Sequence, residues 1–229
     1  MIWTIISAVL VLFVSIWLGE KRFIKLEQIT LRRFLFAGIL GMALFLILRY
    51  LNNLGYFPQA VGAAFMTNCY SSFSGFFLGA AYAQYKMKKD LGDIDYVNTA
   101  FISDLLPNLL ALTIIILGIA RTSVFSDLPV SPIRMSSGVS LIAVGIYAIT
   151  LKVTPELRKK GFVILDREIP WKDLISYNWY QDQVIELEFK YKDQIRIHRS
   201  VVAPEDEKEV EKLLSKKMIE KMEKDADSW

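Results

Sequence analysis

A largely apolar stretch from residue 57 to residue 84 constrains the fold of this 229-residue chain more than any other feature. It is long enough for a helix that crosses a bilayer, yet hydroxyl and amide side chains lie near its middle. On a helix, one face would carry Asn68, Ser71, Ser72, Gly75 and Gly79. Small residues also recur at every fourth position, namely Ser71, Gly75, Gly79 and Ala83. Because helices in lipid pack where small residues let their backbones approach, this stretch predicts a helix surrounded by other helices.

The polar residues in and near this region have two interpretations. Asn68, Ser71 and Ser72 either line a pathway for a substrate or make hydrogen bonds to neighbouring helices, and we favour the second. Asp104, with Asn108 one turn later, is an acidic residue close to an expected span, which is a functional hypothesis in itself. Its place near the start of that helix also suits a capping role, which we favour. If Asp104 faced Asn68, the two would form a proton or cation site.

Hydrophobic residues make up 53% of the whole chain, and most of them lie in residues 1–151. We expect five membrane-spanning helices there, and the segments are 2–18, 34–48, 57–84, 101–120 and 138–151. The last segment is shorter than the usual minimum of about 17 residues, so four spans are the alternative. Segment 2–18 lacks the basic start and the cleavage site of a signal peptide.

Basic residues fix the expected orientation. They follow the first, third and fifth segments, and they are Lys21, Arg22, Lys25, Arg32, Arg33, Lys86, Lys88, Lys89, Lys152, Arg158, Lys159 and Lys160. The opposite loops hold only Arg49, Arg121 and Arg134. Because cytoplasmic loops are enriched in Lys and Arg, we predict a multi-pass protein of the cytoplasmic (inner) membrane with its N-terminus outside and its C-terminus in the cytoplasm.

The charged remainder predicts a small cytoplasmic domain of α+β type. Period-two alternation marks strands at 161–165, 168–171, 175–180, 185–189 and 195–198, which form a meander with one apolar face. A helix is expected from Pro204, with Val210, Leu213, Leu214 and Met218 covering the sheet. The expected division is therefore a helical membrane part at 1–151, a basic linker at 152–160, this domain at 161–222 and a frayed tail at 223–229.

Three short motifs, followed by paired strands and a helix, carry a family resemblance: Gly161-Phe-Val-Ile-Leu165, Ile169-Pro-Trp171 and Tyr177-Asn-Trp179. This part of the chain resembles the C-terminal PH-like domain of small, uncharacterised bacterial multi-span membrane proteins. The resemblance covers about residues 155–218 and none of the spans. It implies a PH-like fold but no catalytic residue. A complete PH fold needs more strands than this sequence shows, which leaves a truncated or dimer-completed version open.

No constellation for catalysis or metal binding is visible. Cys69 and His198 are the single cysteine and histidine, which excludes most His/Cys metal sites, and no hydrolase, nucleotide-binding or zinc-protease motif occurs. We therefore expect no enzyme and no cofactor, and a net charge of +3 gives no indication of nucleic acid. Candidates for contact with anionic lipids of the cytoplasmic leaflet or with a partner are Lys152, Arg158, Lys159, Lys160, Arg196 and Arg199.

The sequence thus favours a membrane scaffold, accessory subunit or sensor whose cytoplasmic domain docks to a protein partner, to a second copy or to the membrane surface. A small transporter or channel-like protein using Asn68 and Asp104 is the main alternative. Immunity against membrane-active peptides is a weaker one.

Overall fold

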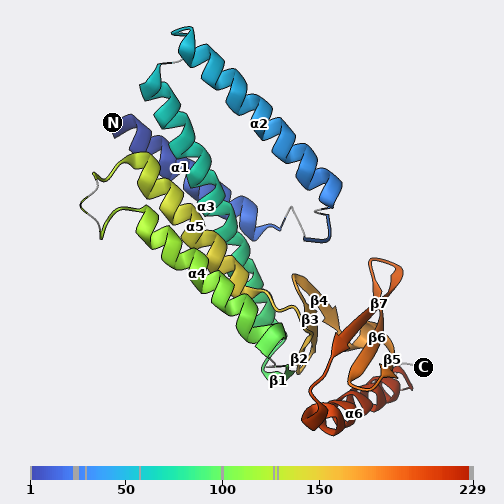
Figure 1. The fold of residues 1–229 in the computed structure, drawn as a ribbon. Helices are drawn as coiled ribbons and strands as arrows, with labels where there is room; N and C mark the ends of the chain where they lie inside the picture. Colours follow the sequence, from blue (N-terminus) through green and yellow to red (C-terminus); the bar gives the residue numbers. More distant parts are fainter. Residues whose placement is uncertain are drawn as a thin grey trace. The chain divides into compact units, whose positions relative to one another are not determined.

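The computed structural model describes residues 2–22, 26–28, 30–56, 58–98, 101–125, 127 and 129–226. Lys25, Phe57 and residues 227–229 of the expected tail lie outside these ranges. The chain divides into two compact units (Figure 1). The helical unit comprises Met1–Ala83 and Leu109–Thr150, and the sheet unit comprises Gln84–Asn108 and Leu151–Trp229. The expected division at residue 151 is therefore incomplete, since residues 84–108 belong with the C-terminal strands.

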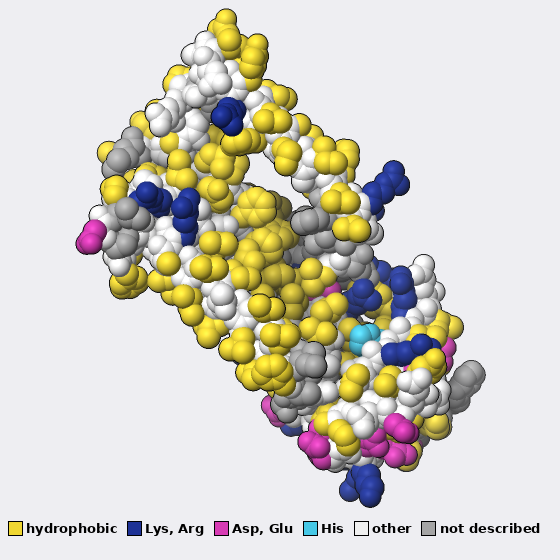
Figure 2. Space-filling model, in the orientation of Figure 1, with side chains coloured by type: hydrophobic (Ala, Val, Ile, Leu, Met, Phe, Trp, Pro, Cys, Tyr) yellow, Lys and Arg dark blue, Asp and Glu magenta, His cyan; other side chains and the backbone are white. Residues whose placement is uncertain are grey.

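In the described residues, one helix lies at each of the five expected spans. They are α1 (Ile2–Glu20), α2 (Leu31–Asn53), α3 (Gln59–Asp90), α4 (Leu106–Arg121) and α5 (Pro132–Thr150), with a short 3-10 turn η1 (Leu26–Gln28) after α1. Among the described residues, α1, α2 and α5 are long and apolar enough to cross a membrane, and α4 is a shorter apolar helix. Hydrophobic side chains cover much of these helices in Figure 2.

Two helices begin earlier in the sequence than expected, and a side-chain hydrogen bond caps the N-terminus of each. The Thr30 hydroxyl accepts a hydrogen bond from the backbone N–H of Arg33 at 3.3 Å, which caps α2. The Ser131 hydroxyl accepts from the N–H of Arg134, also at 3.3 Å, so α5 begins at Pro132 rather than at residue 138. Polar caps of this kind satisfy N–H groups that a helix start leaves without partners. The segment that looked too short to span is therefore long enough.

Glycines bring α1 and α3 into close backbone contact. A methyl group at Gly79 would overlap the carbonyl oxygen of Ile16, and one at Gly75 would overlap that of Leu12. In return, Gly19 of α1 lies against the carbonyl of Phe76. The α4–α5 pair packs in the same manner, through a second set that the sequence analysis did not single out: Gly118, Gly138 and Gly145. Both helix pairs thus use the close approach that small residues allow.

The sheet unit contains two antiparallel sheets. The first has the order β1-β2-β3-β4, formed by β1 (Ile94–Val97), β2 (Glu156–Arg158), β3 (Gly161–Ile164) and β4 (Arg167–Pro170). The 3-10 turn η3 (Trp171–Asp173) leads into the second sheet, β5 (Leu174–Gln181), β6 (Val184–Tyr191) and β7 (Gln194–Val201). A 3-10 turn η4 (Pro204–Asp206) then precedes α6 (Glu207–Ala226).

The five expected strands and the final helix are confirmed, whereas β1 and β2 were not expected. The segment 152–160 is not a linker, because β2 occupies its centre and pairs with both β1 and β3. Residues 223–226 of the expected tail belong to α6, which continues to Ala226. The error at β2 arises because its strand character depends on β1, which is far away in the sequence.

The core of the sheet unit lies between the strands and α6. Phe162 is fully buried, and its ring lies 5.4 Å from that of Trp171 and 5.6 Å from that of Phe189. Val210 and Leu214 of α6 are buried in the same cluster, with Leu213 and Met218 packed against it, as expected from the apolar stripe.

The pairing register of β7 corrects the expectation of a single apolar face. Across from the buried Leu187 and Phe189 of β6 stand His198 and Arg196, not the isoleucines of β7. Because side chains alternate along a strand, Ile195 and Ile197 point to the opposite face of the sheet, where both are exposed. β7 is confirmed as a strand, but its isoleucines lie on the exposed face of the sheet and not on the buried one.

Candidate functional site

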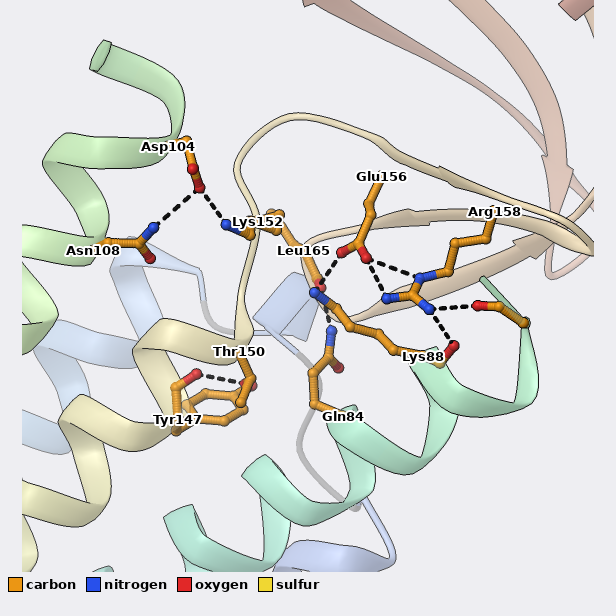
Figure 3. A network of polar contacts seen from close by, with 11 residues as sticks. Gln84, Lys88, Asp104, Asn108, Tyr147, Thr150, Lys152, Glu156, Arg158 and Leu165 are labelled. Atoms are coloured by element: carbon orange, nitrogen blue, oxygen red, sulfur yellow. Dashed lines mark hydrogen bonds and ion pairs between the residues drawn. The ribbon is translucent and has the colours of Figure 1, made fainter. Parts of the chain in front are cut away.

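A buried group of charges joins the last turns of α3 to β2 within the sheet unit (Figure 3). Glu156, only 3% exposed, accepts a hydrogen bond from the Lys88 ammonium at 2.6 Å and forms an ion pair with Arg158. Burial alone would raise the pKa of the Glu156 carboxyl, but the hydrogen bonds and charges of Lys88 and Arg158 hold it below its ordinary value. The three residues therefore form a charge network with an ionised centre.

Arg158 also closes the end of α3. Its Nη1 donates to the carbonyl of Lys88 at 2.7 Å and to that of Gly92 at 2.6 Å. These carbonyls belong to the C-terminal end of α3 and the turn after it, where a helix leaves its last acceptors without partners. Gln84 adds a further link, since its amide donates to the carbonyl of Leu165 at 2.6 Å. Arg158, a candidate for lipid contact, is thus buried in internal contacts.

Asp104 lies in a π-helical turn (Phe101–Leu105) before α4 and does not stand alone. Its carboxylate forms an ion pair with Lys152 and accepts a hydrogen bond from the Asn108 amide at 3.1 Å (Figure 3). Lys152, a candidate for lipid contact, is therefore also engaged in an internal pair. The structure brings together Asp104, Asn108 and Lys152 as a partly buried polar cluster.

Two polar residues in the middle of α3, Asn68 and Ser72, bond to α1. The Ser7 hydroxyl donates to the Asn68 side chain at 3.2 Å, and the hydroxyls of Ser15 and Ser72 lie 3.0 Å apart. Ser71 is buried in the same helix, as is Ala83. Hydrogen bonds between helices and close glycine contacts thus occur along the same face.

A pocket of about 370 Å³ in the sheet unit is lined mostly by lysines. We call it the lysine pocket, and its charged members are Lys159, Lys160, Lys172, Lys217, Glu220, Lys221 and Lys224, around Pro170 and Trp171. The turn between β2 and β3 supplies the first two, η3 supplies the third, and α6 supplies the rest. Lys217, Lys221 and Lys224 fall at i, i+4 and i+7 on one helix face. That spacing was the signal in the sequence, although only the fold joins it to Lys159 and Lys160.

The other two candidate residues for contact lie on β7. Arg199 stacks 3.8 Å above the Tyr180 ring and donates to Glu186 at 2.6 Å, while Arg196 donates to the Gln194 side chain. Both arginines are exposed. In the described part of the chain, no group of three or more His, Cys, Asp or Glu residues has an arrangement that would hold a metal ion.

Comparisons with known proteins concern the sheet unit. No curated protein and no solved structure shows a significant match to the chain. Residues 153–219 match the family model described as "Domain of unknown function (DUF5673)", which extends from just before β2 into α6.

Proposed function

We propose that this chain is a multi-pass protein of a bacterial inner membrane, where it acts as a scaffold, accessory subunit or sensor. Its N-terminus lies outside, and its PH-like sheet unit docks to a protein partner in the cytoplasm. Three apolar helices of spanning length support the membrane assignment. We propose that α3 and α4 also cross the membrane, which gives five spans. The basic loops support the orientation. Within the described residues the sheet unit has seven strands, two more than the sequence indicated, and this number supports the proposal of a PH-like fold.

The outer face of β7 is the observation that carries the docking proposal. Ile195, Ile197 and Val201 are 64%, 59% and 56% exposed, and they point away from the core. β7 is also an edge of its sheet in the described part of the chain. An edge strand offers unpaired backbone groups, and its exposed apolar side chains are best covered by a partner.

The transport alternative has less support. Asn68 and Ser72 have hydrogen-bond partners on α1, and Asp104 pairs with Lys152 and Asn108. We expect Asp104→Asn to leave membrane assembly and partner capture unchanged and to change no ion flux in liposomes. Loss of a proton or cation flux in that variant would favour the transporter instead.

Capture of a partner by the full-length chain in mild detergent tests the docking proposal. We expect a stoichiometric protein partner, identified by mass spectrometry, and its loss in Ile197→Glu. Ile219→Glu is the matched control, because Ile219 is 56% exposed and belongs to α6 rather than to β7. Equal capture by both variants, or a purified chain with no protein partner, would contradict docking through β7. A tag after residue 229 that is reachable from outside intact cells would contradict the orientation.

A further inference from the structure

The lysine pocket has an excess of positive charge that internal pairing does not remove. Six lysines and one glutamate line it. Lys159 pairs with Asp93, and Lys217 lies 3.7 Å from Asp95 and 3.8 Å from Glu220. Lys160, Lys172 and Lys224 are exposed and have no ion pair within the described residues. Three ammonium groups from three separate elements are thus left to face one pocket.

The backbone that presents these lysines is held in place. The Trp171 indole N–H donates to the carbonyls of Arg158 and Lys159 at 2.9 and 3.2 Å, so the turn between β2 and β3 is fixed from one side. The N–H of Lys160 donates to the carbonyl of Leu91 at 3.1 Å, which fixes it from another. Since a preformed site loses less entropy on binding, this arrangement suits a ligand of defined shape.

Two lysines of α6 link the helix to the other walls. Lys217 donates to the carbonyl of Lys159 at 3.2 Å, and Lys221 donates to that of Leu174 at 2.6 Å. An ammonium carries three donors, so its one bond leaves Lys221 with two more for a ligand. Attraction to the C-terminal end of the helix dipole accounts for Lys224 in the last turn, but not for Lys160 and Lys172, which come from other elements.

The chemistry of the lining favours a phosphate group. All its cations are lysines, which act as point charges, and none is the planar guanidinium that pairs side by side with a carboxylate. A tetrahedral phosphate presents oxygens in several directions and matches donors that converge from separate walls. In the sequence, Lys159 and Lys160 follow α5, a helix of spanning length, with only β2 between.

We propose that the lysine pocket binds the phosphate of an anionic phospholipid headgroup. This inference rests on the proposed membrane function, and it gives the sheet unit a lipid contact separate from the protein contact at β7. A phosphate that accepts hydrogen bonds from the three unpaired ammonium groups, and offsets part of their charge, accounts for their placement.

The test measures binding of single lipid molecules to the detergent-purified full-length chain by native mass spectrometry. The lipids are phosphatidic acid, phosphatidylglycerol and phosphatidylcholine, and inorganic phosphate is the soluble competitor. The pocket variant combines Lys160→Gln, Lys172→Gln and Lys224→Gln. Its control combines Lys208→Gln, Lys212→Gln and Lys216→Gln, which removes the same charge from exposed positions of α6 that do not line the pocket.

We expect one tight site for the two anionic lipids and none for phosphatidylcholine. The pocket variant should weaken that site roughly 100-fold, and the control variant should weaken it only a few-fold. An equal loss in both variants, or no tight site for either anionic lipid, would overturn the proposal. Complete displacement of the lipid by millimolar inorganic phosphate would overturn the lipid as the source of the phosphate. Partner capture through β7 is scored separately, so failure here is distinguishable from failure of the proposed function.

Discussion

The buried carboxylate of Glu156 offers the sharpest test of the sheet unit. Glu156→Gln keeps the shape of the side chain but removes its negative charge, so Lys88 and Arg158 remain close together without their common partner. Removal of one member of a buried ion pair costs about 3–5 kcal/mol, because the remaining charges stay desolvated. We therefore expect the hydrogen-exchange rates of the β2 and β3 amides to increase, by a factor between roughly 150 and several thousand.

Hydrogen exchange followed by mass spectrometry on the full-length chain in detergent measures this opening locally. Glu186→Gln is the matched control, because the Glu186–Arg199 pair is also on strands but more open to solvent, with Arg199 51% exposed. A surface pair contributes about 0–1 kcal/mol, so the control should exchange nearly as the unmodified chain does. If Glu156→Gln exchanged no faster than Glu186→Gln, the charge network would not stabilise the sheet unit.

The pH dependence of the same experiment has a defined sign. The pKa of Glu156 is lowered in the folded chain, so its contribution is fully present above the ordinary value of 4.5 and is lost as the pH falls through the folded pKa. The difference in exchange between the unmodified chain and Glu156→Gln should therefore be constant near neutral pH and shrink in acid. A difference that grew as the pH fell would refute the reasoning.

Two further outcomes are expected. Gly79→Ala should destabilise the helical unit by about 1–3 kcal/mol in thermal unfolding, because the added methyl meets the Ile16 carbonyl, whereas Gly41→Ala, with open space around it, should not. Burial, and then the charge of Arg167, lowers the pKa of His198, so the unfolded chain binds a proton more readily and Tm should fall as the pH drops below about 6.5. His198→Gln should flatten that part of the pH profile, and an unchanged profile would contradict the assignment.

Elements with a strong local pattern were predictable from the sequence. The apolar helices and the alternating strands β5 and β6 follow from periodicity, and the GxxxG of Gly75 and Gly79 indicated a packing face that the structure places against α1. Periodicity says which residues share a face, but not which face is buried. The error at Ile195 and Ile197 came from that limit, since the core side of β7 is set by its register with β6.

Contacts between distant segments were not predictable in the same way. β2 is three residues long, and nothing within it predicts that Glu156 and Arg158 pair with each other or that Arg158 bonds to the end of α3. The lysine pocket likewise combines a turn, η3 and α6. Neither site has a signature within one segment, because each depends on the tertiary pairing of the sheet unit.

The position of β1 in the chain has a consequence for the order of folding. Val97 ends β1, and its partner strand begins at Glu156, so α4 and α5 are synthesised between the two. At about 5–20 residues per second, β1 waits roughly 3–12 s on the ribosome before the strand it pairs with has been made. The first sheet therefore forms late in translation. A premature stop within α5 would leave β1 without its partner strand and exposed to quality-control proteases.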